Sequence, residues 1–207
     1  MEKEKSYMLV LPQKEKQLKD VDLVMNNLKN ASGFDVKSIA LNEGTIFVKI
    51  EFQNEAFDVE IFPDAFEMHP MYRTQHIFKD LDIKKIEKSQ TGLCVTMMYS
   101  EKYLDCYNLQ LKIIDCIVPD ALAVLDFCSE KILSGKWVAL AAKSAVPPSP
   151  RYIYTVQAVS EGDSVWLHSH GLNRCGITEL EILNSTKDTY NTHYEIIESF
   201  ASRLLDA

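Results

Sequence analysis

Apolar and polar residues alternate with a period of two in the first part of the chain. Residues 6–12 alternate up to a break at Pro12, and residues 46–52 and 57–61 alternate in the same way. In a strand, alternate side chains share a face, so this pattern predicts strands with one buried face. We expect the last two stretches to pair as a hairpin, preceded by a further strand at residues 36–41.

Other parts of the chain repeat apolar residues at spacings of three and four, which is typical of helices that bury one face. The three clearest stripes run over residues 18–28, 104–118 and 190–204. The middle one carries a second apolar stripe that includes Cys106 and Cys116. We therefore expect that helix to be buried on two sides.

The second half of the chain mixes both patterns. Strands are predicted at residues 93–99 and 121–126, and a short helix at residues 134–143 with Ser134 as its N-terminal cap. Three prolines between residues 147 and 150 exclude helix and predict an extended link. A hairpin and one more strand follow, at residues 152–159, 164–169 and 179–183.

This succession of elements predicts an α+β protein of two compact lobes, each a mostly antiparallel sheet covered by helices. We place the boundary after residue 90, just ahead of the strand that Gly92 opens. Residues 1–90 then form an N-terminal lobe in the order strand, helix, strand, strand, strand. Residues 91–207 form a C-terminal lobe.

Composition and charge narrow the classes of function. Hydrophobic residues make up 46% and charged residues 25% of the 207 residues, as in a chain that folds around a core. Thirty acidic residues against 22 basic ones give a formal charge of -8, which repels phosphate backbones. We therefore expect no nucleic-acid partner for this acidic protein.

Hydropathy and cysteine usage bear on location. No run approaches the roughly 20 apolar residues of a membrane helix, and residues 1–6 lack the apolar stretch of a signal peptide. We expect no membrane association and a cytoplasmic location. The five cysteines are scattered without a Cys-x-x-Cys pair, which predicts reduced and mostly buried thiols.

One segment, residues 166–181, concentrates side chains that bind metals, move protons or hold anions. On a strand, His168 and His170 share a face with Trp166 beside them. Glu179 and Glu181 share a face of the next strand. Whether the two pairs meet depends on the register, because the connection over residues 171–177 has room for a bulge.

Two interpretations of these four side chains stay open. If His170 lies opposite Glu179, then His168 lies opposite Glu181, and the cluster suits Zn or Mn with a water for metal-assisted hydrolysis. A slip of one residue turns the glutamates away. The simpler interpretation is that the histidines and glutamates bond one another and backbone groups.

Arg174 and Cys175 complete the candidate binding residues. Arg174 either pairs with Glu179 or Glu181 and pins the loop, or recognises a carboxylate or phosphate of a ligand. The histidines and Arg174 would lower the pKa of the Cys175 thiol and make it nucleophilic. A buried, inert thiol is the interpretation that we prefer for Cys175.

Three stretches carry a resemblance to a known family. They are Ser144-Ala-Val-Pro-Pro-Ser-Pro-Arg-Tyr152, Trp166-Leu-His-Ser-His-Gly-Leu-Asn-Arg-Cys-Gly176 and Glu179-Leu-Glu-Ile-Leu183. Together they resemble a family of uncharacterised bacterial proteins known as a domain of unknown function. The resemblance covers mainly residues 104–207 and implies no activity, and Ser169 stands where that motif has threonine. Members of the family can be longer than this chain.

Three functional hypotheses follow. The first is a non-catalytic binding or interaction module for a protein or a small molecule, without a cofactor. The alternative is a metal-dependent hydrolase in which His168 and His170 hold Zn or Mn, with Glu179 or Glu181 as a further ligand or general base. The third is a purely structural motif in which Gly171 and Gly176 permit a turn.

Overall fold

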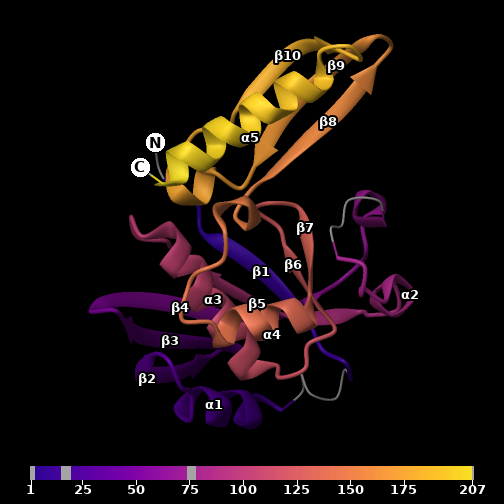
Figure 1. The fold of residues 1–207 in the computed structure, drawn as a ribbon. Helices are drawn as coiled ribbons and strands as arrows, with labels where there is room; N and C mark the ends of the chain where they lie inside the picture. Colours follow the sequence, from indigo (N-terminus) through magenta and orange to yellow (C-terminus); the bar gives the residue numbers. More distant parts are fainter. Residues whose placement is uncertain (1–2, 15–19, 74–77, 207) are drawn as a thin grey trace.

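Two antiparallel β-sheets organise the chain, for which the computed structural model describes residues 3–14, 20–73 and 78–206 (Figure 1). The larger sheet has seven strands in the order β2 (Asp35–Asn42), β3 (Thr45–Phe52), β4 (Glu55–Ala65), β5 (Thr91–Met97), β1 (Ser6–Leu11), β6 (Ala123–Asp126) and β7 (Lys131–Ser134). The smaller sheet has three, in the order β10 (Glu181–Thr186), β9 (Ser164–His170) and β8 (Thr155–Glu161). The predicted α+β class with two sheet-based lobes is confirmed.

The predicted hairpin of the first half is formed by β3 and β4. Val48 lies opposite Val59, and Ile46 opposite Ile61, so apolar side chains meet on the buried face. Such cross-strand pairs stabilise a sheet because the facing side chains lie close together. The strand predicted at residues 36–41 is β2, which pairs with β3 at the edge of the sheet.

Both faces of the larger sheet are covered. The helices α1 (Val21–Lys29), α3 (Tyr103–Ile117) and α4 (Gly135–Lys143) lie on one face, and α2 (Ile83–Ile86) with the 3-10 helix η2 (Pro70–Arg73) lies on the other. In β1, which lies between β5 and β6, Met8 and Val10 join the core under α3, while Leu9 and Leu11 join the core under α2. A strand covered on both sides is apolar at nearly every position.

The helix starts and faces follow the predicted signals. The Ser134 hydroxyl accepts a hydrogen bond from the Trp137 amide and caps α4, as expected. Asp20 caps α1 in the same way through the Leu23 amide. The two-sided burial of α3 is confirmed, since its buried residues surround the helix. Leu18, the first residue of the stripe predicted at 18–28, lies outside the described residues.

The smaller unit, residues 155–206, consists of the three-stranded sheet and α5 (Tyr190–Asp206), and it projects from the larger one (Figure 1). Ile197 and Ala201 of α5 pack on the sheet face formed by Val165 and Leu167. Leu205 is buried at the end of the helix, where the stripe predicted Leu204. None of the helices in the described part of the chain is long and apolar enough to cross a lipid bilayer.

The division between the two units differs from the boundary that we placed after residue 90. The strands β5, β6 and β7 all follow that residue, yet they belong to the larger sheet, where β5 lies between β4 and β1. The larger unit therefore extends to α4, and the units divide in the link before β8. Alternation along a strand reveals its buried face but not its neighbours, which is why β1 gave no sign of pairing with β5 and β6.

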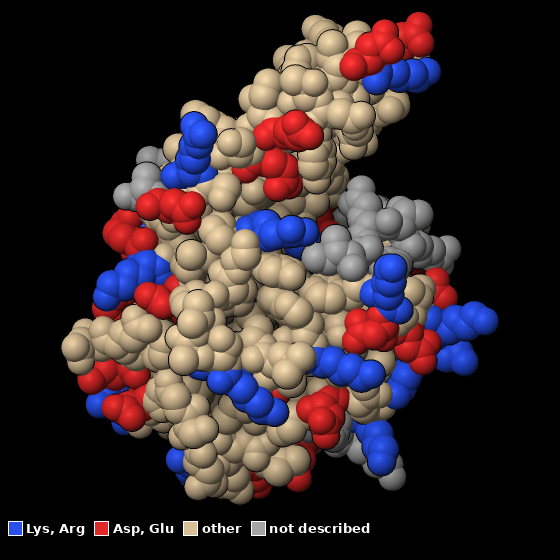
Figure 2. Space-filling view, in the orientation of Figure 1, with Lys and Arg blue, Asp and Glu red and all other residues tan. Residues whose placement is uncertain are grey.

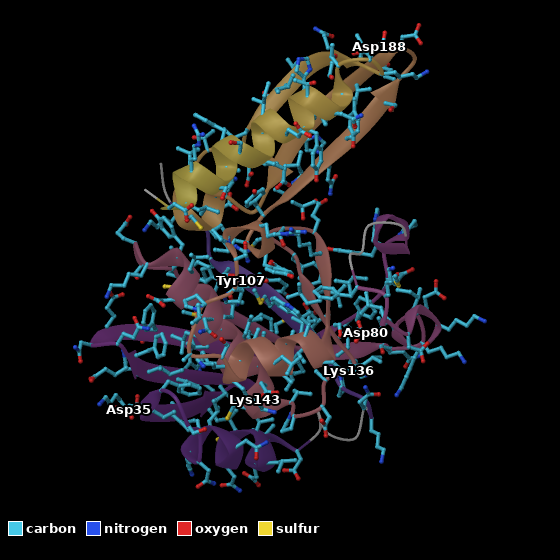
Figure 3. The ribbon with its side chains drawn as sticks, viewed as in Figure 1. Asp35, Asp80, Tyr107, Lys136, Lys143 and Asp188 are labelled. Atoms are coloured by element: carbon cyan, nitrogen blue, oxygen red, sulfur yellow. The ribbon has the colours of Figure 1, made fainter. Side chains whose placement is uncertain are left out.

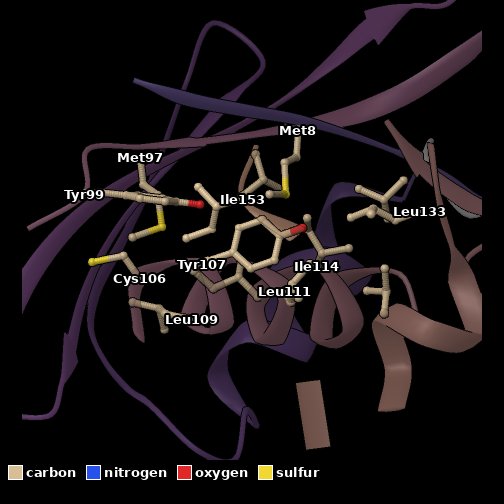
Figure 4. Packing of buried hydrophobic residues seen from close by; sticks show 14 of the residues in the cluster. Met8, Met97, Tyr99, Cys106, Tyr107, Leu109, Leu111, Ile114, Leu133 and Ile153 are labelled. Carbon is tan, nitrogen blue, oxygen red and sulfur yellow. The ribbon is translucent and has the colours of Figure 1, made fainter. Parts of the chain in front are cut away.

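The two units share a continuous core at their junction. Ile153, which follows the 3-10 helix η3 (Pro150–Tyr152), is buried among Tyr107, Leu111 and Met8 of the larger unit (Figure 4). Figure 3 places Tyr107 below the junction and Asp188 at the far tip of the smaller unit. The smaller unit is thus anchored at one end only, and the junction lies beside the segment with the candidate chemistry.

Candidate functional site

The candidate site begins with three side chains on one face of β9. The Trp166 and His168 rings are stacked, with centroids 3.9 Å apart and planes at 26°. The His168 and His170 rings meet edge to face, with centroids 4.7 Å apart. Val165 and Leu167 point the other way, into the core under α5. The prediction that both imidazoles project together from an extended segment is confirmed.

The register of β9 and β10 brings one of the two glutamates of the predicted cluster to the histidines. Glu181 lies directly opposite His168, in the register that would bring the glutamates to the histidines. Its Oε2 accepts a hydrogen bond of 3.1 Å from the Trp166 indole nitrogen. Glu181 therefore belongs to the same face as the two imidazoles.

Glu179 does not join that face. Its Oε1 accepts hydrogen bonds from the backbone amides of Gly171 (2.8 Å) and Asn173 (3.1 Å). Its Oε2 accepts a 2.5 Å hydrogen bond from the Ser169 hydroxyl. A carboxylate with two amide donors and a hydroxyl on its oxygens fixes the loop after β9. Glu179 is thus a loop-capping residue, which corrects the predicted four-ligand cluster.

The metal-binding interpretation loses its ligand set for this reason. Within residues 3–14, 20–73 and 78–206, no group of three or more His, Cys, Asp or Glu side chains is arranged to hold a metal ion. His168 and His170 remain as two imidazoles side by side. A structural or catalytic zinc site needs at least three protein ligands.

Glu130, which the sequence reading missed, joins the histidines instead. Its Oε1 lies 3.7 Å from His170 Nδ1, and its Oε2 accepts a hydrogen bond from the Gln157 side-chain amide. Gln157 lies opposite His168 on β8. Glu130 belongs to the tight turn between β6 and β7 and has a left-handed backbone, with φ of 55°. Nothing in the spacing of residues 166–181 points to a turn in the other unit.

Two imidazole nitrogens of this face lie out of contact with solvent. His168 Nδ1 and His170 Nε2 are buried, and neither has a hydrogen-bond partner among the described residues. Burial lowers the pKa of His168 below 6.5, and the neighbouring His170 lowers it further. At neutral pH the His168 ring is therefore uncharged and offers one donor and one acceptor nitrogen.

A pocket of about 340 Å³ opens beside His170, between the two units. Glu4 and Glu130 line it from the larger unit, and His170 and Glu179 line it from the smaller one. Lys5, also in the wall, has its ammonium 2.7 Å from a Glu60 carboxylate. On the face in Figure 2 acidic and basic side chains are interspersed, so the excess of carboxylates at the pocket is a local feature.

Arg174 lies under this pocket and does not pair with either glutamate. Its guanidinium is fully buried and donates two hydrogen bonds to Asp126, of 2.9 and 2.8 Å, and one to the Ser6 hydroxyl of 3.2 Å. The rings of Tyr99 and Tyr107 flank it at 5.7 and 5.3 Å. Arg174 does fix the loop, as one of the two predictions has it, but its partner is Asp126 of β6 and not a glutamate. Its guanidinium is fully buried and therefore cannot contact a ligand.

Cys175 is buried with 1% of its surface exposed. Burial raises the pKa of its thiol to about 12, and the charge of Arg174 offsets only part of this rise. The thiol therefore stays protonated at neutral pH, which removes the nucleophilic interpretation. The preferred prediction of a buried, inert thiol agrees with this environment.

Comparison with known proteins gives two matches that divide the chain at the same place as the fold. A family model described as protein of unknown function (DUF4026) N-terminal matches residues 6–148, and one described as DUF4026 C-terminal matches residues 153–207. Neither the curated proteins nor the solved structures contain a match. The resemblance to a family of unknown function is confirmed, and it extends over both units.

Proposed function

Because the chain belongs to the DUF4026 family of proteins of unknown function, we propose its role from its own geometry. It is a non-catalytic binding module that holds a cationic nitrogen group, an ammonium or a guanidinium, at the junction of its two units. The site consists of Trp166, His168 and His170 on β9, Glu181 on β10 and Glu130 in the β6–β7 turn. We name this set the cation site.

The single observation that carries the proposal is the pair of unpartnered nitrogens, His168 Nδ1 and His170 Nε2, in two adjacent rings, with Glu130 3.7 Å from the other nitrogen of His170. Burying a polar atom without a partner is costly, so such atoms mark a place where a ligand supplies the missing hydrogen bond. An ammonium brings three N–H donors and a guanidinium brings up to five. An unpartnered imidazole nitrogen and a carboxylate are the acceptors that these donors require.

The charge around the site favours a cation. Glu130 and Glu181 flank the histidines, while the two nearby cations, Lys5 and Arg174, are paired with Glu60 and Asp126. The excess of negative charge is therefore not neutralised by the described neighbours. A formal charge of -8 on the whole chain also draws cations toward it at low ionic strength.

Trp166 adds an aromatic surface. It is 40% exposed although it is one of the largest apolar side chains, and its indole is held in place by Glu181 and by stacking on His168. A fixed and accessible indole attracts cations over its ring face. This contact and the hydrogen bonds to the imidazoles would act on the same bound group.

The metal-dependent hydrolase is the weaker reading of the same residues. Of the two glutamates offered as ligand or general base, Glu179 already accepts three hydrogen bonds within its own loop, and Glu181 accepts one from Trp166. The cytoplasmic location that we expected remains part of the proposal. All five cysteines are free, in keeping with a reducing compartment.

A titration followed by NMR tests the proposal. Labelled protein is titrated with N-acetyl-arginine amide, with N-acetyl-lysine amide and with the uncharged N-acetyl-citrulline amide. We expect the two cations to shift the imidazole signals of His168 and His170 saturably and the citrulline compound to leave them unchanged. Equal shifts from all three compounds, or none from either cation up to millimolar concentration, would refute the cation site.

Two variants connect the binding to the site. Glu130→Gln removes one charge beside His170 and should weaken binding of both cations at least about tenfold, as expected for a hydrogen bond to a charged group. Glu43→Gln is the matched control, because Glu43 is exposed in the β2–β3 turn at the opposite edge of the larger sheet. Agmatine alone and a short arginine-containing peptide then distinguish a free amine from a protein side chain as the natural source.

A further inference from the structure

A second pocket, of about 280 Å³, lies on the junction of the two units and shares no lining residue with the pocket beside His170. Its walls come from β7, from the link into β8 and from α5. The polar side chains that the argument uses are Lys131, Arg151, Tyr154, Thr155, Tyr194 and Glu198. None of them belongs to the cation site.

Lys131 is an unusual residue for its place. It lies on β7 between buried neighbours, and only 9% of its surface is exposed. Its Nζ donates hydrogen bonds to the backbone oxygens of Arg151, at 2.6 Å, and of Tyr154. No salt bridge among the described residues includes Lys131. An ammonium buried without a carboxylate at contact distance is costly, which favours the uncharged amine.

The uncharged amine has the geometry of a nucleophile here. It carries two N–H bonds, and the two backbone carbonyls accept two hydrogen bonds from it. The remaining tetrahedral position on Nζ then holds the lone pair. Burial lowers the pKa of Lys131 to about 8, with the charge of Asp126 opposing this. Roughly a tenth of the side chains are therefore uncharged at pH 7.

Two carboxylates of α5, Glu195 and Glu198, also line the pocket, and Glu198 accepts hydrogen bonds from two hydroxyls. Glu198 Oε2 accepts a hydrogen bond from the Tyr154 hydroxyl at 3.1 Å, and Oε1 accepts one from the Tyr194 hydroxyl at 3.3 Å. Burial and the charge of Glu198 raise the pKa of Tyr194 to about 12, so its hydroxyl keeps its proton. The Glu198 carboxylate is thus held in place in the wall of the pocket that Lys131 also lines.

Two further groups point to an oxygen-bearing ligand. The Thr155 hydroxyl oxygen is buried and has no hydrogen-bond partner within the described chain. Arg151 is exposed at the rim, where its guanidinium is the cation of the pocket in contact with solvent. A ligand with a carbonyl oxygen and an anionic group would bond Thr155 with the first and Arg151 with the second.

We propose that Lys131 condenses reversibly with the carbonyl carbon of a small aldehyde or keto acid that carries an anionic group. The volume of about 280 Å³ lies at the small end of ligand pockets, which limits the ligand to a few carbon atoms. Thr155 holds the carbonyl oxygen, and Arg151 holds the anionic group. Glu198 stabilises the positive charge of the product.

The reaction needs no reactant beyond one proton from solvent water. The lone pair of Nζ forms the C–N bond, the electrons of the carbonyl double bond move to oxygen, and one proton passes from nitrogen to that oxygen. The hydroxyl of the resulting carbinolamine takes up one proton from solvent water, and water leaves as the C–O bond breaks, which forms the C=N bond of a protonated imine. No oxidant or reductant takes part, and the step reverses when water adds back.

Trapping of the imine tests the inference. The intact chain is incubated at pH 7.5 with glyoxylate and sodium cyanoborohydride, digested, and analysed by mass spectrometry. We expect Lys131 to be labelled at least about tenfold more than Lys187, because an exposed lysine is almost wholly protonated at this pH. The Lys187 side chain is 72% exposed. Labelling of Lys131 no greater than that of Lys187 would overturn the inference.

Two comparisons test the anionic group. Acetaldehyde has the carbonyl of glyoxylate but a methyl group in place of the carboxylate, and it should label Lys131 several-fold less. Arg151→Ala should abolish the preference for glyoxylate over acetaldehyde, with an unchanged melting temperature because Arg151 is exposed. Equal labelling by both compounds in the parent chain would show that the pocket does not recognise an anion.

Discussion

Arg174 and Asp126 form a two-point ion pair, with N–O distances of 2.9 and 2.8 Å, in which both side chains are fully buried. Arg174 belongs to the 3-10 helix η4 (Asn173–Cys175) that follows β9, and Asp126 ends β6. The pair therefore connects the loop after the cation site to the larger sheet. The Ser6 hydroxyl of β1 accepts a third hydrogen bond from the same guanidinium.

Removal of one partner should be strongly destabilising. Arg174→Met leaves the Asp126 carboxylate buried without a counter-charge, which costs about 3–5 kcal/mol of unfolding free energy. The double change Arg174→Met with Asp126→Leu should recover part of that loss. Urea denaturation measures the unfolding free energy of the single and the double variant. Lys49→Met is the control, since the exposed Lys49–Asp58 pair contributes less than about 1 kcal/mol.

Glu179→Gln should loosen the loop after β9. The carboxylate accepts two backbone amides and the Ser169 hydroxyl, and an amide cannot offer acceptors on both of its heavy atoms. We expect a loss of about 1–3 kcal/mol, with faster hydrogen exchange at the amides of Gly171 and Asn173. Glu181→Gln, which changes one contact with Trp166, should leave exchange at these amides unchanged and provides the comparison.

Period-two patterning predicted the core of the candidate site well. Trp166, His168 and His170 share a face because alternate residues of a strand must, whatever the strand pairs with. The Ser134 cap and the two-sided burial of α3 were predictable for the same reason, since each depends on residues close together in the chain. Local geometry thus determined these features.

Local patterns in the sequence cannot predict partners that come from strands far away along the chain. Glu130 reaches His170 only because β7 forms the edge of the larger sheet nearest to the smaller unit. Asp126 meets Arg174 across 48 residues of sequence. A charged residue in a sequence gives no sign of whether its partner is a neighbour or lies in another unit, which is why the predicted pairing of Arg174 with Glu179 or Glu181 is wrong.

Binding at the cation site should weaken in acid. The folded state holds the pKa of His168 below its ordinary 6.5, through burial and then His170, and the nearby Glu130, Glu181 and Glu179 oppose this only in part. The stability contributed by the uncharged ring is therefore complete above pH 6.5 and is lost as the pH falls through the lower folded pKa. A protonated ring neither accepts a hydrogen bond nor tolerates a cation beside it.

The measurement is the dissociation constant of N-acetyl-arginine amide between pH 8 and pH 5, together with the melting temperature. Both quantities should be constant above about pH 6.5, the ordinary pKa of histidine. Below that pH the dissociation constant should rise and the melting temperature should fall. His168→Gln should flatten the acid limb of the binding curve. Tighter binding at pH 5 than at pH 8 would contradict an uncharged imidazole as acceptor.

Trp166→Leu should weaken cation binding without unfolding the chain. The indole is 40% exposed, so its loss leaves no large cavity. An exposed cation–π contact contributes about 0.5–1 kcal/mol, so its loss should make the dissociation constant about two- to fivefold larger. The control is Ile196→Ala, because Ile196 is 53% exposed on α5, which covers the opposite face of the sheet. Equal effects of the two changes on affinity would remove Trp166 from the site.

Gly171→Ala should disturb the site through the backbone alone. Gly171 follows His170 with a φ of +109°, and a Cβ there would lie 2.6 Å from the Ile153 backbone oxygen.

Gly44 is the matched control, with a φ of +82° and open space around its Cβ position. Gly44→Ala should cost about 1–2 kcal/mol from the left-handed backbone alone. Gly171→Ala adds a backbone clash that no side-chain rotation relieves, so its loss in urea denaturation should exceed that of Gly44→Ala. It should also displace the imidazole signals of His170. Equal losses for the two glycines would mean that the loop moves freely away from Ile153, and the cation site would then lack the rigid support that its geometry requires.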